Sequence, residues 1–237
     1  NLHRWAVSFL RSQGVKLDIA SDAEINECWR NAFSAAGTGK WSEAFLQNEW
    51  EQVVQAQGVS GKADYLRASR TGRWVRLTRK ERAEVWEIFD EFKRELDELG
   101  KVEWLEVIRQ TRLYLAQNGN ILPYRAAVVD ETQDLHPEEL KLIRQIVPPG
   151  DNDLFLVGDA HQRIYGRQVV LGHCGINVVG RSRKLKINCR TTEEIKIWSV
   201  AILRNLPFDD LDGGADSHAD GYRSLLSGAP PVIRNWP

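Results

Sequence analysis

The sequence predicts an α/β protein in which a long, mainly helical segment precedes the beginning of a parallel sheet. Apolar residues recur at helical spacing through the first half of the chain. Further on, two short apolar runs end in acidic residues, and a helical stretch separates them. A strand, a helix and a second strand joined by short connections are typical of α/β folds.

The first 120 residues or so are expected to be mainly helical. Apolar side chains that share one helix face recur three or four positions apart, or at multiples of this spacing, at Trp86, Phe89, Phe92 and Leu96 and again at Trp104, Ile108 and Leu115. Charged residues fill the other faces, as they do on helices at a protein surface.

The pattern changes after Pro123. The run Ala126–Val129 is short and apolar, which predicts a buried parallel strand. Pro137 is placed to open a helix, because proline is favoured at the first helical position. The run Leu154–Val157 predicts a second buried strand, which ends at Gly158-Asp159.

A further strand is expected near residues 185–187, followed by a helix from about Thr192. Thr191 and Glu194 have the spacing of a capping box at the start of that helix. The last stretch, residues 209–237, is rich in Gly, Asp and Pro and is expected to form loop and an edge strand.

Composition limits the class of protein. Hydrophobic residues make up 42% of the 237 residues and charged residues 27%, close to the values of ordinary globular proteins. The net charge of -1 does not decide about a nucleic-acid partner, because basic surface can be confined to one stripe. The three cysteines form no C-x-x-C pair, which argues against a disulfide framework or a zinc site. No apolar run approaches the ~20 residues that span a bilayer, so we expect a soluble cytoplasmic protein.

The first candidate for chemistry is the run Val128–Asp134, in which Asp130 and Glu131 follow a strand. Open α/β sheets bind ligands at the carboxyl ends of their strands. Nucleotide hydrolysis needs a carboxylate to hold Mg²⁺ and another group to orient the attacking water. An Asp-Glu pair alone is better interpreted as a solvated acidic turn, but Asp-Glu-x-Gln-Asp after an apolar strand is more specific.

Two further clusters lie downstream. In the run Leu156–Gly166, Gln162 follows Gly-Asp at a strand end, where a neutral amide can bond both a phosphate oxygen and a water. In the run Leu185–Thr191, Arg190 stands at a strand-to-helix turn, where a guanidinium can grip phosphate with two parallel bonds. Each of these alone is better interpreted as an ordinary junction between elements.

Taken together, the three clusters resemble motifs II, III and IV of superfamily 1 DNA helicases of the UvrD/Rep/PcrA kind. The family patterns are Asp-Glu-x-Gln-Asp, Gly-Asp-x-x-Gln-x-Ile-Tyr and Asn-Tyr-Arg-[Ser/Thr], and the close match covers about residues 124–195. The resemblance implies part of a RecA-like P-loop NTPase motor with a large helical insertion. The implied domains are the insertion over 1–122, part of the first motor domain over 123–185 and the start of the second over 186–237.

The function that the resemblance implies is an ATP-dependent DNA repair motor that moves 3′ to 5′ on single-stranded DNA and separates duplex DNA. Asp130 would hold Mg²⁺, and Glu131 would activate the attacking water. Gln162 would couple the γ-phosphate of ATP to the DNA site, and Arg190 would contact that phosphate from the second motor domain. Tyr165 would lie near the DNA, because bases stack on aromatic rings.

The family's phosphate loop, G-x-x-x-x-G-K-[ST], should lie well upstream of motif II. The only candidate is the run Ala36–Lys40, and Trp41 follows its lysine where a hydroxyl is required. We interpret this run as a loop between helices and expect the true loop upstream of Asn1. The chain alone is therefore expected to hydrolyse ATP poorly or not at all.

Two other positions depart from the family. Cys189 stands where the family has a tyrosine that is expected to stack on adenine, which a cysteine cannot do. After Tyr165 the family has an aromatic residue and an arginine that face DNA, whereas Arg167 and Gln168 occupy those places here. Arg167 remains a candidate DNA contact.

A basic stretch offers a second set of candidate DNA contacts. Its members recur about three apart and are Arg67, Arg70, Arg73, Arg76, Arg79, Lys80 and Arg82. We take Arg73 and Arg76 as its candidates, because phosphate contacts need cations on one side. The alternative is a solvated charged face balanced by Glu81 and Glu84, and the two interpretations are about level.

Two alternative functions remain open at this point. The chain could be the motor part of a helicase-nuclease, although it contains no nuclease constellation. It could also be a degenerate motor that clamps DNA or a protein partner without catalysis. A pure clamp has no need of all four of Asp130, Glu131, Gln162 and Arg190, so their presence argues against degeneracy. Cys189 and the altered residues after Tyr165 argue mildly for it.

Overall fold

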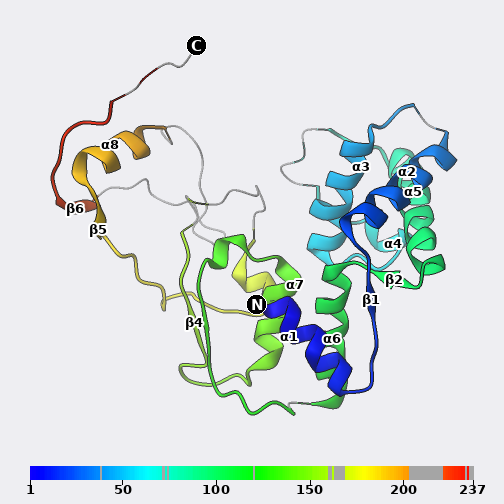
Figure 1. The fold of residues 1–237 in the computed structure, drawn as a ribbon, viewed down its shortest axis with the longest axis horizontal. Helices are drawn as coiled ribbons and strands as arrows, with labels where there is room; N and C mark the ends of the chain where they lie inside the picture. Colours follow the sequence, from blue (N-terminus) through cyan, green and yellow to red (C-terminus); the bar gives the residue numbers. More distant parts are fainter. Residues whose placement is uncertain are drawn as a thin grey trace. The chain divides into compact units, whose positions relative to one another are not determined.

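The structure is a computed structural model, shown in Figure 1, and it divides into two compact units, Asn1–Val157 and Gly158–Pro237. Each unit is described by itself. The residues that the structure describes are 1–37, 39–70, 73, 75–119, 121–159, 162, 169–202, 221–232 and 234. Within them, no helix combines the length and the apolar character that a membrane span requires.

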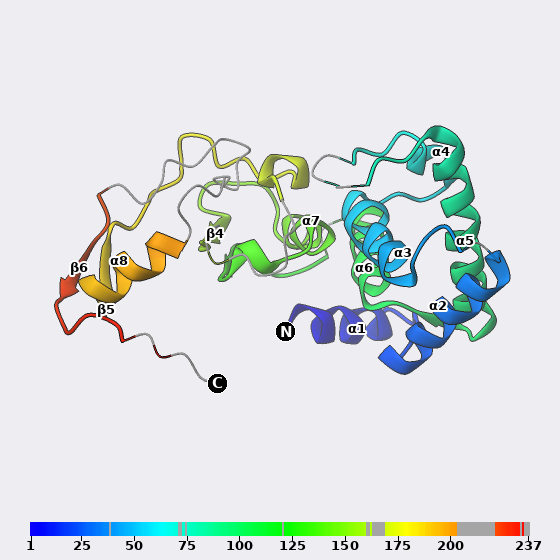
Figure 2. The same ribbon diagram turned by 90° about the horizontal axis from the view of Figure 1, so that it is seen from above.

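A helical bundle forms the first of two cores in unit 1 (Figures 1 and 2). Its elements are α2 (Asp22–Ala36), α3 (Glu43–Glu49), the π-helix η1 (Trp50–Gln55), α4 (Lys62–Tyr65) and α5 (Arg79–Glu98). The stripe predicted from Trp86 to Leu96 is buried along α5, so this helix prediction is confirmed. Trp29 stacks on Phe92 with ring centroids 3.9 Å apart, and this pair lies in the core that joins α2 to α5.

A second core joins α1 (Leu2–Ser12), α6 (Trp104–Asn118) and α7 (Pro137–Ile146). The parallel pair β1 (Asp18–Ile19) and β2 (Lys101–Val102) links the two cores. Ile108 and Leu115 are buried as predicted, but Trp104 is 41% exposed and makes a T-shaped contact with the His3 ring, with centroids 5.5 Å apart. Because α1 and α6 share this core with α7, the helical region contributes to both cores. The predicted boundary after residue 122 stays a prediction.

The predicted strand–helix–strand unit is confirmed. Strands β3 (Ala127–Val129) and β4 (Leu154–Leu156) pair in parallel with Val128 opposite Phe155, and α7 connects them. Pro137 lies in the first turn of α7, as its sequence position predicted.

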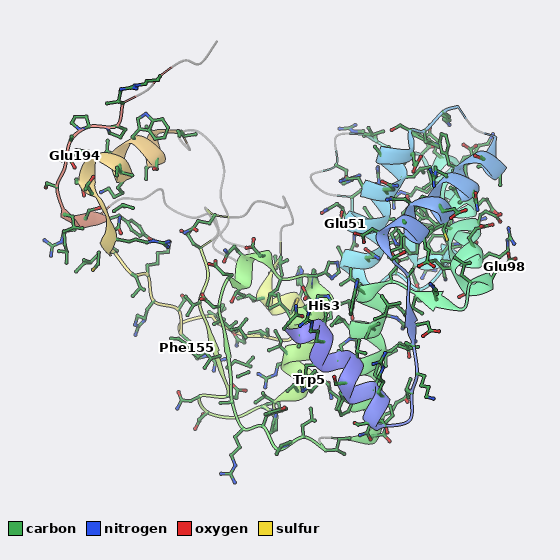
Figure 3. All side chains as sticks on the ribbon, viewed as in Figure 1. His3, Trp5, Glu51, Glu98, Phe155 and Glu194 are labelled. Carbon is green, nitrogen blue, oxygen red and sulfur yellow. The ribbon has the colours of Figure 1, made fainter. Side chains whose placement is uncertain are left out.

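The prediction that both strands are buried is wrong for one face of this pair. Ala127 and Leu154 pack on the second core, whereas Val128 is 78% exposed and Phe155 is 64% exposed (Figure 3). The reason is the alternation of side chains along a strand, since neighbouring residues point to opposite faces.

Unit 2 contains the third parallel pair of the described residues, after β1–β2 and β3–β4 of unit 1. Strand β5 (Ile187–Thr192) pairs with β6 (Arg223–Leu226), which lies within the region predicted to hold an edge strand, and α8 (Glu193–Ile202) follows β5 directly. The predicted capping box at Thr191 is wrong, because α8 begins at Glu193, so the residue directly before the helix is Thr192. Thr192 takes its place, and its hydroxyl accepts a hydrogen bond from the Ile195 amide at 3.4 Å.

Candidate nucleotide site

The turn after β3 is anchored to the end of β4. The Val157 amide donates to the Val129 carbonyl at 2.8 Å and extends the strand pairing by one step. Thr132 then donates twice to the Val157 carbonyl, from its amide at 3.0 Å and from its hydroxyl at 2.9 Å. Asp130 and Glu131 are therefore held between two fixed points, at the carboxyl ends of two parallel strands.

Glu131 has a left-handed backbone, with φ 51° and ψ 42°. For a residue other than glycine, this conformation costs roughly 1 kcal/mol or more. Its amide donates to Asp130 Oδ1 at 2.9 Å, and its carbonyl accepts from the Asp134 amide at 2.9 Å. Backbone strain of this kind clusters at functional sites, where the surrounding structure imposes it.

The side chain of Glu131 is exposed, but one of its oxygens is held. Gln133 is 2% exposed, and its Nε2 donates to Glu131 Oε2 at 2.7 Å. Sequence reasoning gave neither Gln133 nor Thr132 a role. The glutamine is part of the Asp-Glu-x-Gln-Asp pattern, but only the structure shows that its side chain is buried and hydrogen-bonded to Glu131.

Asp130 fits the role of a magnesium ligand. Its side chain is exposed, and Oδ1 is its only bonded oxygen among the described residues. In nucleotide sites Mg²⁺ is bound by one or two carboxylates together with phosphate oxygens and waters, not by an all-protein cage. The described residues contain no cluster of three acidic, His or Cys side chains that could form such a cage.

Helix α7 begins at Pro137, three residues after Asp134 ends the acidic motif, and is capped by His136. The imidazole Nδ1 accepts from the Glu138 amide at 3.2 Å, while the Glu139 carboxylate accepts from the His136 amide at 2.8 Å. Burial lowers the pKa of His136 to about 4, so the ring is neutral near pH 7 and carries its proton on Nε2. This Nε2 and Asp134 Oδ1 are buried without a hydrogen-bond partner in the described part of the chain.

Gln162 and Arg190 belong to unit 2, and Asp130 and Glu131 belong to unit 1. The Gln162 side chain is exposed, and its Nε2 donates to Asp159 Oδ2 at 2.9 Å. Tyr165 and Arg167, the candidate DNA contacts of this segment, lie outside the described residues.

Arg190 lies within β5, three residues before Glu193 begins α8, and an Asx turn of Asn188 organises the backbone around it. Asn188 Oδ1 accepts from the amides of Arg190 at 2.9 Å and Thr191 at 3.3 Å, and its Nδ2 donates to the Ser224 hydroxyl at 3.1 Å. This links the turn to β6 and leaves the Arg190 side chain exposed. Cys189 is exposed beside it. Sequence reasoning had given Asn188 no role.

The basic stretch does not form one continuous stripe. Arg70 and Arg73 turn inward and form ion pairs with the buried Glu49, at 2.5 and 3.2 Å. Tyr65 donates its hydroxyl to the same carboxylate at 2.9 Å, and burial raises the pKa of this tyrosine. Arg76 is exposed. The structure thus gives Arg73 an internal partner, and the assignment of Arg73 and Arg76 to DNA stays a prediction.

Arg82, the last of the basic stretch, is also engaged. Its Nη1 donates to the carbonyls of Tyr65 at 3.1 Å and Ala68 at 2.8 Å, which closes the end of α4. The predicted loop between helices is confirmed for the described residues Gly37, Gly39 and Lys40, which lie between α2 and α3, with Gly37 left-handed at the end of α2. Lys40 forms ion pairs with Glu81 at 3.0 Å and Glu84 at 3.3 Å.

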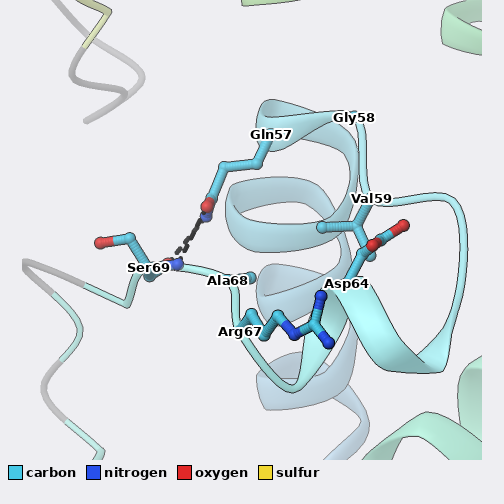
Figure 4. Close-up of a pocket in the computed structure, with 7 residues that line it drawn as sticks. All are labelled: Gln57, Gly58, Val59, Asp64, Arg67, Ala68 and Ser69. Atoms are coloured by element: carbon cyan, nitrogen blue, oxygen red, sulfur yellow. Dashed lines mark hydrogen bonds between the residues drawn. The ribbon is translucent and has the colours of Figure 1, made fainter.

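A shallow pocket of about 250 Å³ lies in the helical bundle (Figure 4). It is lined by Gln57, Gly58, Val59, Asp64, Arg67, Ala68 and Ser69. The Gln57 side chain closes one side, since it donates to the Ser69 carbonyl at 2.7 Å and accepts from the Ser69 amide at 3.0 Å. None of its residues belongs to the three motifs.

Comparison with protein families decides the relationship. The family model of the UvrD/REP helicase N-terminal domain matches residues 1–168. The chain belongs to the UvrD/REP helicase family. The matched region contains the acidic motif and Gln162, and it includes the helical segment that precedes them. No curated protein matched the chain.

Membership in the UvrD/REP family places the protein among ATP-dependent DNA helicases. It confirms the resemblance drawn from the three motifs, and the mixed helices and parallel strands agree with an α/β helicase fold. The match ends before Arg190, so the role of Arg190 rests on the motif resemblance alone. The roles of the individual site residues stay predictions.

Proposed function

We propose that this UvrD/REP protein is an ATP-driven motor that moves 3′ to 5′ on single-stranded DNA and separates duplex DNA, and that the chain carries part of its nucleotide site. The observation that carries the proposal is the arrangement of Asp130 and Glu131. They follow a parallel strand, the second has a left-handed backbone, and its carboxylate is held by an amide. A solvated acidic turn needs neither the strain nor the anchor.

In the proposed mechanism, Glu131 accepts a proton from the water that attacks the γ-phosphate of ATP. Asp130, with one oxygen bonded by the Glu131 amide, would hold a magnesium ion with its other oxygen. That ion would supply neutralisation of the phosphate charge. Gln162 offers an amide that hydrogen-bonds the γ-phosphate and signals its loss to the DNA site.

Arg190 is proposed to bind the same phosphate from the second motor domain. A guanidinium can form two parallel hydrogen bonds with phosphate oxygens, and it stabilises charge there without giving up a proton. The Asn188 turn fixes the backbone from which this side chain extends. The exposed Cys189 at the neighbouring position leaves adenine stacking to another residue or to none.

The test is ATP hydrolysis stimulated by single-stranded DNA. Because the chain contains no G-x-x-x-x-G-K-[ST] sequence, it is measured on this chain and on a version extended upstream of Asn1 through a phosphate loop. We expect turnover only in the extended protein, and loss of at least 100-fold on Glu131→Gln. Glu98→Gln, an exposed carboxylate on α5, is the matched control and should keep full activity. Unwinding of duplexes with a 3′ or a 5′ tail then decides direction.

Two other results would contradict parts of the proposed function. Turnover by this chain alone, lost on Glu131→Gln, would contradict the need for an upstream phosphate loop. If neither form hydrolyses ATP but the extended protein binds DNA in a salt-dependent way, the motifs are relics. The non-catalytic DNA clamp would then be the better description.

A further inference from the structure

We propose that Gln133 is a positioning residue that holds the Glu131 carboxylate in the orientation that accepts a proton from the attacking water. The inference rests on the proposed function and deepens it. Its starting point is the hydrogen bond from Gln133 Nε2 to Glu131 Oε2, at 2.7 Å. This is the one side-chain bond that Glu131 makes among the described residues.

The burial of Gln133 makes this bond directional. Its side chain is 2% exposed, whereas the glutamate that it contacts is exposed. A buried amide has few rotamers open to it, so the donor has a fixed place. An exposed glutamate without such a donor would sample many rotamers, and a catalytic base must lie within hydrogen-bond reach of its proton.

The backbone around this pair is equally constrained. Thr132, which lies between the two residues, is tied by two hydrogen bonds to the Val157 carbonyl. The left-handed backbone of Glu131 turns the chain so that residues two apart, 131 and 133, meet through their side chains. The strained backbone of Glu131 therefore places its carboxylate within hydrogen-bond distance of the Gln133 amide.

The chemical nature of the donor fits a base. A lysine or arginine in this place would neutralise the carboxylate and reduce its ability to take a proton. An amide is neutral and keeps its own protons, so it orients one oxygen while the carboxylate stays charged. No ion pair involves Glu131 in the described part of the chain. The second oxygen, Oε1, accepts no hydrogen bond from the described residues.

The experiment uses the extended protein with Gln133→Met, which keeps the length of the side chain and removes the donor. We expect kcat for DNA-stimulated ATP hydrolysis to fall by about 10- to 100-fold. The KM for ATP and the Kd for single-stranded DNA should stay within about twofold, because Gln133 is not proposed to touch either ligand. Gln110→Met is the matched control, since it removes a similar bond, from Gln110 Nε2 to Glu106 Oε1 at 2.6 Å on α6.

A double-mutant cycle separates positioning from a general structural role. If Gln133 acts through Glu131, adding Gln133→Met to Glu131→Gln should cause no further loss of kcat. A further loss as large as that in the wild-type background would overturn the inference. Gln133→Asn, which stays uncharged but is too short to hold the same bond, is a second variant in case Gln133→Met unfolds, and it should also lower kcat without changing the KM for ATP.

The possible results distinguish a failure of the proposed function from a failure of the role proposed for Gln133. If the extended wild type does not hydrolyse ATP, the proposed function fails and the inference fails with it. If the wild type turns over and depends on Glu131, but Gln133→Met retains its kcat, only the inference is wrong. The inference is also wrong if Gln110→Met and Gln133→Met lower kcat equally, since the effect would then be a general loss of stability.

Discussion

The carboxylate of Glu49 is fully buried and accepts both hydrogen bonds of the Arg70 fork, from Nε at 2.5 Å and from Nη2 at 3.0 Å. Arg73 Nε adds a contact at 3.2 Å to the second oxygen. Two arginines from the irregular segment after α4 are thereby fastened to the last residue of α3. A buried charge cluster of Glu49, Arg70 and Arg73 fixes this segment to the bundle. The two arginines therefore already have a partner inside the protein.

We expect Arg70→Met to lower the free energy of unfolding by about 3–5 kcal/mol. Removing one partner of a buried ion pair leaves a charge without compensation, although Arg73 offsets part of that cost here. Urea denaturation monitored by tryptophan fluorescence measures the change. Arg76→Met, an exposed neighbour in the same segment, should stay within about 0.5 kcal/mol of wild type. Equal effects at both positions would contradict a structural role for Arg70.

The exposed Arg76 is the better candidate for a DNA contact in this stretch. We expect Arg76→Gln to weaken binding of single-stranded DNA and to reduce the slope of log affinity against log salt by about 0.7, the value for one lost phosphate contact. Fluorescence anisotropy of a labelled oligonucleotide over a range of salt measures this. Arg30→Gln, an exposed arginine on α2, removes the same charge and should leave the slope unchanged. An unchanged slope for Arg76→Gln would make Arg76 part of a solvated face.

Local sequence signals predicted the local elements well. The stripe along α5, Pro137 at the start of α7 and the acids after β3 depend on residues close together in the chain, and the structure has each of them. The basic stretch does not form the predicted stripe, because the orientation of its arginines depends on residues far away in the sequence. The partner of Arg70 lies on α3, 21 residues earlier, and no local periodicity reveals that a buried carboxylate will turn an arginine inward.

The site shows the same division. The acidic pair could be predicted because its residue types and its place after a strand are local features. The role of Gln133 could not, because it depends on the left-handed backbone of Glu131, which propensity disfavours for glutamate. Thr191 was likewise assigned as a cap because the strand β5 runs further than its apolar residues indicate.

The strained backbone at Glu131 should reverse the usual order of stability of a glycine and an alanine variant. Alanine normally stabilises a protein relative to glycine, because glycine has more freedom in the unfolded chain. At a φ of 51° we expect the reverse, with Glu131→Gly more stable than Glu131→Ala by about 1 kcal/mol. Both variants lack the carboxylate and lose the bond to Gln133, so their difference isolates the backbone. Thermal or urea unfolding measures it, and the usual order would show that the left-handed turn is not populated in solution.

Glu103 stands at the junction of the two cores of unit 1, just before α6. Its Oε2 accepts from Trp50 Nε1 and from Gln55 Nε2, both at 3.0 Å. These donors are the first and last residues of the π-helix η1, whose i to i+5 repeat brings residues five apart to one side. Burial raises the pKa of Glu103 from 4.5 to about 7 despite the two bonds, which lower it.

This raised pKa gives stability a defined dependence on pH. Between pH 4.5 and 7 the folded protein keeps a proton that the unfolded chain has released, so the free energy of unfolding falls as pH rises through this window. Glu103→Gln keeps an oxygen for both donors and removes the titration. We expect it to gain up to roughly 3 kcal/mol over wild type at pH 8 and almost nothing at pH 4, because each pH unit contributes about 1.4 kcal/mol.

The difference between the two proteins at each pH is the quantity to measure, because all other titrating groups cancel in it. Urea denaturation in steps from pH 4 to pH 8 gives that difference directly. Burial is the largest cause of the raised pKa of Glu103 and the neighbouring carboxylate Glu106 the smallest, so Glu106→Gln should leave most of the slope in place. A gain for Glu103→Gln that is constant across the range would mean that the variant improves packing and that Glu103 does not titrate in this window.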